Sequence, residues 1–532
     1  MRIGIDFGTT HTVAAVVDKG GNYRVVSFGG VDRWPSVIAA NAAGELRLGL
    51  DAAAVRHEPG WSVLRSFKRL LNDAGPQTVV ELGGRSYRLA DLLTSFLTQL
   101  KRDLQHRSNA PLAPGERVEA AISVPANASS AQRFLTLDAF AEAGFEVVAL
   151  LNEPSAAGLE YADRYRCTIT AKREYVLIYD LGGGTFDASL LKMTGRLNEV
   201  VTSEGIQRLG GDDFDEAICQ LVLNESRLSK LDAATHDLLL EECAVRKEAV
   251  GANTRRFLVD LSAADAPPFC CSIDDVYAAC APLVEQTITV LSRVLRDPAR
   301  DGADVDPSEV AGIYAVGGAG SFPLVARMLR RSFGDKHVKR SPQPFAATAV
   351  GLAVFLDTQA DFALSERLSR HFGVFREAHR GADVTFDPIL PKDLALPPDG
   401  QPPLVVTRSY RAAHNIGHFR FMECSRLCEG RPDGDVTPYD AVFFPFDPDL
   451  HDQQDLGRRP VGRREDGPDV EERYVITPGG AVEVTLTTRP GAFARTFRLR
   501  DTSPKAPDGS ATSRRRKVNT DAQPKASTPR VG

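Results

Sequence analysis

A short pattern occurs twice in this chain, and few folds can accommodate it. In each copy an apolar strand ends in Asp-x-Gly, passes through a turn of glycine and threonine, and continues as a second strand. The copies are Ile5–Thr10 and Tyr179–Thr185. Because self-similarity of this kind marks a repeated structural unit, we expect two similar lobes that face each other.

Turns of this composition are typical of phosphate-binding sites. Glycine lets the backbone approach an anion closely, its N–H groups converge on phosphate oxygens, and threonine hydroxyls add donors. The two candidate turns are Gly8–Thr10 and Gly182–Thr185. The aspartate before each turn, Asp6 or Asp180, can hold the water shell of Mg²⁺, which prefers oxygen ligands. An aspartate at a strand end also commonly caps a turn, but the duplication favours the metal-binding interpretation.

Other nucleotide-binding folds are disfavoured because their motifs do not occur in the sequence. There is no Gly-x-x-x-x-Gly-Lys-Ser/Thr run, and the glycines after Asp6 do not form Gly-x-Gly-x-x-Gly. A third glycine turn, Gly317–Gly320, follows an apolar strand and precedes a helical pattern. It is either an ordinary strand-to-helix loop or a place where the backbone passes close to a nucleoside.

The sequence up to about residue 355 alternates strand and helix patterns. Ser129 and Ser130 are candidate caps for one of the helices, and Gly144 follows its end. The expected strands are Ile3–Phe7, Thr12–Val17, Ala120–Val124, Tyr175–Asp180 and Ala188–Met193. The expected helices are Leu92–Leu104, Ala131–Ala143, Pro323–Phe333 and Ala346–Leu356. This part of the chain is therefore of the α/β class.

After the last of these helices the apolar runs become short and alternating, as in antiparallel sheets. Pro478–Gly480 followed by Val482–Leu486 is a hairpin signature. From about Thr502 the chain is polar and includes Arg514–Lys517, so it contains too few apolar residues to fold. The other expected strands are Leu404–Tyr410, His418–Cys424, Ala441–Phe446 and Tyr474–Ile476. The predicted domains are residues 1–357 with the two lobes, 358–500 with a small β domain, and 501–532 as a disordered basic tail.

The bulk composition indicates a globular chain with more than one core. A chain of 532 residues with 43% apolar residues exceeds the roughly 300 residues that one core serves. The formal charge of −6 gives no general attraction to nucleic acid. Asp6 stands where a signal peptide needs apolar residues and no run reaches the length of a membrane span, so we expect a cytoplasmic protein without a membrane partner.

The spacing of the eight cysteines does not indicate a disulfide framework. Cys424 and Cys428 are four residues apart, so they could bind a metal or form a redox pair only if a helix carried them.

Several segments together resemble the seventy-kilodalton heat-shock chaperones, within the superfamily that also contains actin and sugar kinases. Gly4–Thr10 is similar to the family's first phosphate motif, and Asp180–Asp187 is similar to its second. The segments that distinguish chaperones from the rest of the superfamily are Ser123–Ala126 with Gln132 and Arg133, Leu151–Ala157 and Leu209–Asp215. The resemblance extends over roughly residues 1 to 355.

The resemblance implies an actin-like ATPase fold, in which two ribonuclease-H-like lobes close over ATP or ADP with Mg²⁺, followed by a small antiparallel β-sandwich-like domain. By similarity the catalytic residues are Lys68, Asp6, Glu153, Asp180 and Thr185, and Asp6 and Asp180 reach the metal through water. The implied nucleotide-binding residues are Gly8, Thr9, Thr10, Gly182, Gly183, Gly184, Gly210, Gly211, Lys247, Gly317 and Gly318. Lys68 matches the lysine that approaches the γ-phosphate, where a cation stabilises the charge of phosphoryl transfer. Pro125 and Arg133 match positions that link the nucleotide and substrate domains.

The chain departs from the family's pattern on the adenine side and in its second half. In an ungapped register Ala244 and Gly251 replace Glu and Ser, and Ser321 replaces an arginine that stacks on the base. Nucleotide affinity and base preference are therefore open. Residues Asp357–Gly373 do not match the family's Leu-rich acidic linker, and the residues after the β domain are too few and too polar for its helical lid.

Three hypotheses remain, and the first is favoured. It is an atypical chaperone-like ATPase whose lidless β domain binds an unfolded peptide or a dedicated client protein, with a J-domain protein and a nucleotide-exchange factor as further partners. The second is a small-molecule kinase, against which Asn152–Pro154 and Leu209–Gly211 weigh. The third is a nucleotide-sensing scaffold or an actin-like filament former.

Overall fold

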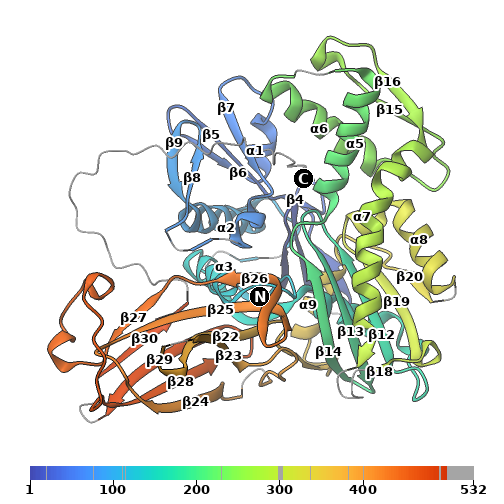
Figure 1. The fold of residues 1–532 in the computed structure, drawn as a ribbon. Coiled ribbons are helices and arrows are strands. Elements are labelled where there is room, and N and C mark those ends of the chain that lie inside the picture. Colours follow the sequence, from blue (N-terminus) through green and yellow to red (C-terminus); the bar gives the residue numbers. More distant parts are fainter. Residues whose placement is uncertain are drawn as a thin grey trace, which may run out of the picture. The chain divides into compact units, whose positions relative to one another are not determined.

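The computed structural model describes residues 1–499 apart from residues 19–20, 73, 76, 111, 114, 229–230, 298–302, 336, 382, 399–400 and 490–492. The basic tail expected at 501–532 lies outside the described residues. Figure 1 shows the course of the described chain and labels many of its elements. Within these ranges no helix is long and apolar enough to cross a membrane.

The N-terminal part is built on a mixed sheet with the strand order β11-β10-β1-β2-β3, to which β4 is added beside β2. The central strand β1 pairs in parallel with β10 and antiparallel with β2. The strands are β1 (Arg2–Phe7), β2 (His11–Val17), β3 (Tyr23–Val25), β4 (Trp34–Pro35), β10 (Glu119–Val124) and β11 (Glu146–Asn152). The helices α2 (Leu89–His106) and α3 (Ser130–Glu142) bury apolar residues in the same core. Ser129 caps α3 by accepting a hydrogen bond from the N–H of Gln132, as the sequence predicts for a helix start.

Between β4 and α2 the chain forms a smaller three-stranded sheet, β6-β5-β7, and a hairpin, β8-β9. Its elements are β5 (Val37–Asn41), β6 (Leu46–Leu48), α1 (Leu50–Val55), β7 (Trp61–Arg65), the 3-10 helix η1 (Phe67–Asn72), β8 (Val79–Leu82) and β9 (Arg85–Arg88). This segment places η1 next to the end of β1, because the rings of Phe67 and Phe7 lie 6.0 Å apart.

A second mixed sheet, with the order β20-β19-β12-β13-β14-β21, repeats the pairing of the first. Its central strand β12 pairs antiparallel with β13 and in parallel with β19, as β1 does with β2 and β10. The strands are β12 (Tyr175–Leu181), β13 (Phe186–Thr194), β14 (Leu197–Ile206), β19 (Val310–Val316), β20 (Val338–Arg340) and β21 (Ala363–Ser365). The elements that accompany it are α5 (Gly211–Ser226), α6 (Ala233–Glu248), β15 (Arg256–Val259), β16 (Phe269–Ser272), α7 (Ile273–Val294) and α8 (Pro323–Phe333).

Two helices, α4 (Glu153–Arg164) and α9 (Ala347–Leu356), pack tightly against each other. α9 also packs against β1, and α4 packs against β12 and β13. A Cβ atom on Gly351 would lie 1.7 Å from the carbonyl oxygen of Ala156, and one on Gly4 would lie 2.5 Å from the carbonyl oxygen of Ala349. Only glycine permits approaches this close between two backbones. α9 is buried around nearly its whole circumference, which explains its almost purely apolar sequence.

Residues from about 371 onward form two antiparallel sheets, β23-β22-β25-β26 with β27 beside β25, and β24-β28-β29-β30. Both sheets contribute to one hydrophobic core, which includes Phe372, Phe421, Tyr474 and Val484. The hairpin expected at Pro478–Gly480 joins β28 to β29. The strands are β22 (His371–Ala378), β23 (Asp383–Leu390), β24 (Leu404–Arg411), β25 (Ile416–Cys428), β26 (Arg431–Pro438), β27 (Val442–Pro445), β28 (Asp469–Ile476), β29 (Val482–Arg489) and β30 (Ala494–Arg498). This part is called the β domain below.

The segment between α9 and the β domain is bonded to both of its neighbours. β21 extends the second sheet by a parallel strand beside β14. Glu366 accepts hydrogen bonds from the backbone N–H and the side-chain amide of Asn152, at 3.0 and 2.6 Å. Arg370 is 4% exposed and lies 3.5 Å from Glu423 of the β domain. The segment, in which the sequence analysis found no Leu-rich acidic linker, therefore has defined partners on both sides.

The eight cysteines are free thiols in the described structure. Cys424 and Cys428 lie on the strand β25, so the helix that a metal or redox pair would need at this spacing is not formed. Cys424 is buried and Cys428 is exposed, which separates their environments further.

The packing of α9 on α4 gives a test of the fold. Gly351→Ala is expected to lower the free energy of unfolding by roughly 2 kcal/mol or more, because the new methyl group meets a backbone oxygen that cannot rotate away. Urea denaturation of the purified variant measures this loss. Gly158→Ala in α4 is the matched control, since its methyl group would meet the end of the Leu191 side chain, which can move. Equal stability of the two variants would contradict the close approach.

Candidate functional site

The two glycine–threonine turns of the repeated pattern meet at one cavity of about 760 Å³. A Cβ atom on Gly183 would lie 2.4 Å from Cγ2 of Thr10, and one on Gly184 would lie 2.7 Å from Cγ2 of Thr9. Side chains are never this close, so the contact between the turns requires glycine at both positions. The structure therefore brings the end of β1 and the end of β12 to the same place.

Most of the catalytic and nucleotide-binding residues expected from the sequence line this cavity. They are Asp6, Gly8, Thr9, Thr10, Lys68, Glu153, Asp180, Gly182, Gly183, Thr185, Gly211, Lys247, Gly317 and Gly318. Gly184 and Gly210 have a different place: Gly184 touches Thr9, and a Cβ atom on Gly210 would lie 2.6 Å from the backbone of Gly183. These two glycines allow chain segments to approach each other behind the cavity wall.

Lys68 is held at the cavity by the packing of its own short helix. Its neighbour Phe67 is fully buried against Phe7 and Phe96. Lys68 Nζ donates a hydrogen bond to Glu153 Oε1 at 2.6 Å and lies 5.4 Å from the centre of the Phe7 ring. Because Glu153 is the first residue of α4, the lysine ties η1 to the start of that helix.

Negative charge exceeds positive charge at this end of the cavity. Loss of hydration, together with repulsion from Glu153, raises the pKa of Asp6 to about 7, while Lys68 opposes the shift. Loss of hydration and the neighbouring carboxylates raise the pKa of Asp180 well above its usual range. Loss of hydration and Glu153 also raise the pKa of Asp187 to about 7. One lysine does not neutralise this group of carboxylates.

A divalent cation bound here would relieve the repulsion, and the carboxylate oxygens suit Mg²⁺. In the part of the chain that the structure describes, no three or more His, Cys, Asp or Glu side chains are arranged to hold a metal directly. The carboxylates of Asp6 and Asp180 line the same cavity, and the resemblance implies that they reach the metal through water.

Asp187 is a functional candidate that was not selected from the sequence. Its side chain is buried, and its Oδ1 accepts a hydrogen bond from the N–H of Asn127 at 3.3 Å. Together with Thr185 and Pro125 it borders a small hollow beside the main cavity. The signal was present, because Asp187 is the last residue of the second phosphate motif.

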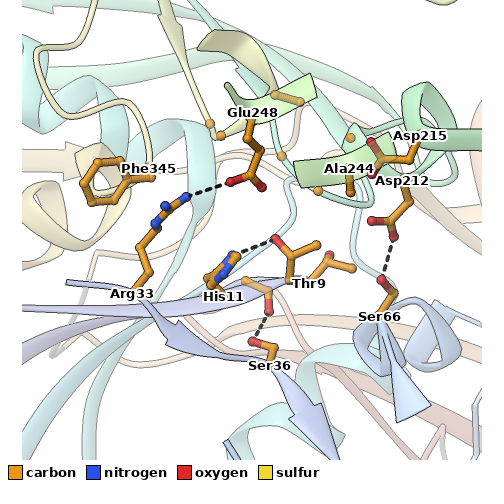
Figure 2. A pocket seen from close by; sticks show the side chains of 18 of the residues that line it. Thr9, His11, Arg33, Ser36, Ser66, Asp212, Asp215, Ala244, Glu248 and Phe345 are labelled. Carbon is orange, nitrogen blue, oxygen red and sulfur yellow. Dashed lines mark hydrogen bonds and ion pairs between the residues drawn. The ribbon is translucent and has the colours of Figure 1, made fainter. Parts of the chain in front are cut away.

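The other end of the cavity is lined by α6, by the Gly317–Ser321 turn and by residues next to β4 and α9 (Figure 2). Lys247 Nζ donates to the carbonyl oxygen of Gly211 at 2.7 Å and lies 2.6 Å from Asp215 Oδ1. This lysine is therefore anchored between α5 and α6. Ala244 and Ser321, the replacements noted in the sequence, both reach the cavity wall.

Four further lining residues at this end, Arg33, Glu248, Phe345 and His11, had no sequence signal. Arg33 Nη1 lies 3.6 Å from Glu248 Oε2, and its guanidinium carbon lies 5.3 Å from the centre of the Phe345 ring. Figure 2 shows Arg33 reaching from the N-terminal part of the chain toward Glu248 on α6. His11 Nδ1 lies 3.3 Å from Thr10 Oγ1, and burial with the nearby Arg33 lowers the pKa of His11 to about 4.

The N-terminal part of the chain and α5 are also bonded directly across the cavity. Ser66 Oγ donates to Asp212 Oδ2 at 2.6 Å, and Arg69 Nη2 donates to Asp213 Oδ2 at 2.5 Å. Ser66 has a positive φ of 52°, an unusual conformation for a residue with a side chain. Strained backbone next to Lys68 is consistent with a functional position.

Arg133 lies away from the cavity, at the contact between α3 and the β domain. It is buried, and its guanidinium donates to Asn152 Oδ1 and to the carbonyl oxygen of Gly479, both at 2.8 Å. Burial lowers the pKa of Arg133, although Glu366 and Glu423 oppose the shift. Arg133 therefore joins the start of α4 to the β28–β29 hairpin.

A family model described as Hsp70 protein matches residues 2–362 of this chain. The chain belongs to the Hsp70 family. Membership gives residues 2–362 the actin-like ATPase fold, in agreement with the mixed α/β sheets described above.

This Hsp70-family chain is similar to several curated proteins that carry the name "Chaperone protein HscA homolog". The protein from Laribacter hongkongensis is 33% identical over 373 residues, which are 66% of this chain and 58% of the relative. The protein from Methylobacillus flagellatus is 31% identical over 368 residues, 66% of this chain and 57% of the relative. The protein from Methylococcus capsulatus is 33% identical over 350 residues, 63% of this chain and 54% of the relative. The chain thus spans somewhat more than half the length of these relatives.

The raised pKa of Asp6 gives a test of the site's electrostatics in the nucleotide-free protein. The folded carboxyl titrates near 7 and the unfolded one near 3.8. Between these values the folded state binds more protons, so Asp6 lowers stability as the pH rises toward 7. Asp6→Asn is therefore expected to raise the unfolding temperature at pH 8 by about 2 °C, corresponding to roughly 1 kcal/mol, and by less at pH 5.

Thermal unfolding at the two pH values, without nucleotide or divalent cation, measures this difference. Asp18→Asn is the matched control, because Asp18 is a surface carboxylate paired with Arg24. A lower unfolding temperature of Asp6→Asn at pH 8 would show that the carboxylate is stabilised rather than repelled by its surroundings.

Proposed function

We propose that this chain binds and slowly hydrolyses ATP with Mg²⁺ in the cavity, and that the nucleotide state is coupled to the binding of an unfolded peptide or a dedicated client by the β domain. The observation that carries the proposal is the meeting of the two glycine–threonine turns beside Lys68, Glu153, Asp6 and Asp180 in one cavity. The relatives are named as chaperones, which supports the proposed function.

In this proposal the two sheets are ribonuclease-H-like lobes that close over ADP or ATP. The N–H groups of Gly8–Thr10 and Gly182–Thr185, with the threonine hydroxyls, hold the phosphates. Asp6 and Asp180 would hold Mg²⁺ through its water shell, and the metal would neutralise part of the phosphate charge. Lys68 stabilises the charge that develops on the transferring oxygens, and Glu153 orients it.

The catalytic role of Lys68 is directly testable. Lys68→Ala is expected to reduce the turnover of ATP at least a hundredfold, because a charge-stabilising group of the transition state is lost. Nucleotide binding is expected to change little, since the turns hold the phosphates. Single-turnover hydrolysis and equilibrium binding of ATP separate these two effects.

Lys101→Ala is the control for Lys68→Ala, because Lys101 is a lysine on α2 that bonds to the carbonyl oxygen of Gly144. A wild-type rate in Lys68→Ala would refute the assigned role. Loss of both binding and turnover would instead indicate a structural role for the Lys68–Glu153 pair.

For the β domain we propose binding of an extended client without a helical lid. Arg133 lies where α3 meets the β domain, and Pro125 borders the small hollow beside Thr185 and Asp187. Both residues are proposed to transmit the nucleotide state. Ser130 Oγ and Arg370 both contact Glu423, so a polar network accompanies Arg133 across the contact. By analogy with chaperones of this family, a J-domain protein and a nucleotide-exchange factor are the proposed partners.

Coupling is tested by measuring ATP hydrolysis with and without a reduced and alkylated, permanently unfolded protein. Wild type is expected to be stimulated several-fold. Arg133→Ala is expected to keep the basal rate and to lose most of the stimulation, because the bond from Arg133 to Gly479 joins the two parts. Arg88→Ala, at an exposed arginine paired with Asp91, is the control.

If Arg133→Ala does not fold, Arg133→Lys keeps the charge but cannot reach Asn152 and Gly479 together, and it tests the same bond. Full stimulation in this folded variant would remove Arg133 from the coupling. Absence of stimulation in wild type would contradict the client-binding role of the β domain.

A further inference from the structure

The nucleoside end of the cavity is bridged by an ion pair between two separate parts of the chain. Arg33 precedes β4 in the N-terminal part, and Glu248 ends α6. Trp34, next to Arg33, is fully buried and donates from its Nε1 to Asp103 at 2.9 Å. Arg33 is therefore fixed at its backbone by a core residue, and its side chain lies on the wall of the cavity (Figure 2).

The direction of a bound nucleotide follows from the lining of the cavity. The glycine–threonine turns and Lys68 lie at one end, which leaves the other end for the base. That end has apolar walls, to which Ala244, Val245, Val250 and Phe322 contribute. An aromatic base suits such a surface, and one cavity of about 760 Å³ is large enough for a nucleotide.

The guanidinium of Arg33 is placed to cover a base at that end. It lies above the ring of Phe345 at 5.3 Å and beside Glu248 at 3.6 Å, so both neighbours restrict its position. The Arg33 side chain is still 40% exposed, and it can therefore take a further partner. Planar guanidinium groups stack on nucleobases as well as on aromatic side chains.

We propose that Arg33 contacts the base of the bound nucleotide from the N-terminal lobe, and that Glu248 and Phe345 position its guanidinium. The inference rests on the proposed nucleotide binding and deepens it. The base would then be held between the two lobes, since α6 belongs to the second and Arg33 to the first. The loss of side-chain contacts at Ala244 and Ser321 would be offset from the opposite side of the cavity.

The experiment compares ligands with and without a base. Binding of ATP, ADP and inorganic tripolyphosphate is measured for wild type and for Arg33→Ala, with Arg24→Ala as the control because Arg24 is a surface arginine paired with Asp18. Arg33→Ala is expected to weaken the binding of ATP and ADP about fivefold and to leave the binding of tripolyphosphate unchanged. Arg33→Lys is expected to recover little, because an ammonium group does not stack as a plane.

Glu248→Gln is expected to weaken ATP binding by a smaller factor than Arg33→Ala does, since Phe345 still restricts the Arg33 guanidinium. An equal loss of affinity for ATP and tripolyphosphate would overturn the inference. It would show that Arg33 attracts the phosphates, or that its ion pair with Glu248 only joins the two lobes. Unchanged ATP binding in Arg33→Ala would overturn it as well. In either case wild-type ATP binding would leave the proposed function standing, whereas a wild type that binds tripolyphosphate but no nucleotide would refute both.

Discussion

The contact between the two glycine–threonine turns is the constraint on which the rest of the site depends. Gly183 and Gly184 touch Thr10 and Thr9 at distances that no side chain at either glycine would permit. This contact brings the ends of two separate sheets to one cavity, which Asp6 and Asp180 both line. The carboxylates then repel one another, and a divalent cation bound beside them would relieve that repulsion.

The polar contacts that surround Glu423 of the β domain are buried. Arg370 and Glu423 are each 4% exposed, and Ser130, which bonds to Glu423, is also buried. Buried ionic groups of this kind add little net stability, but breaking one partner is costly because the other charge remains without water. Such a network favours one defined orientation of the β domain over many similar ones.

Local sequence signals predicted the regular elements closely. The helix α8 has the bounds expected from the sequence, Pro323–Phe333, and α9 begins one residue later than expected, at Ala347. Periodicity, caps and glycine turns act within a few residues of the chain, so they are readable without coordinates. The repeated pattern also predicted Asp6, Asp180 and the glycine–threonine turns as site residues. Lys68 came only from the resemblance, because it carries no local sign of its role.

Contacts between distant parts of the sequence were not predictable in this way. The pairing of β21 with β14, the burial of Arg370 and the approach of Arg33 to Glu248 each depend on how separate elements pack. No periodic pattern or motif specifies such a contact, and a single sequence contains no record of which positions change together. Asp187 lies between these two cases. Its motif was identified in the sequence, but its burial was seen only in the structure.

The position of Trp34 has a consequence for spectroscopy. The chain contains two tryptophans, and the other is Trp61 at the start of β7. Both belong to the N-terminal part of the protein, and Trp34 is buried next to the residue that reaches across the cavity. Indole emission therefore reports on the surroundings of the N-terminal part of the protein, whereas the β domain contributes no tryptophan signal of its own.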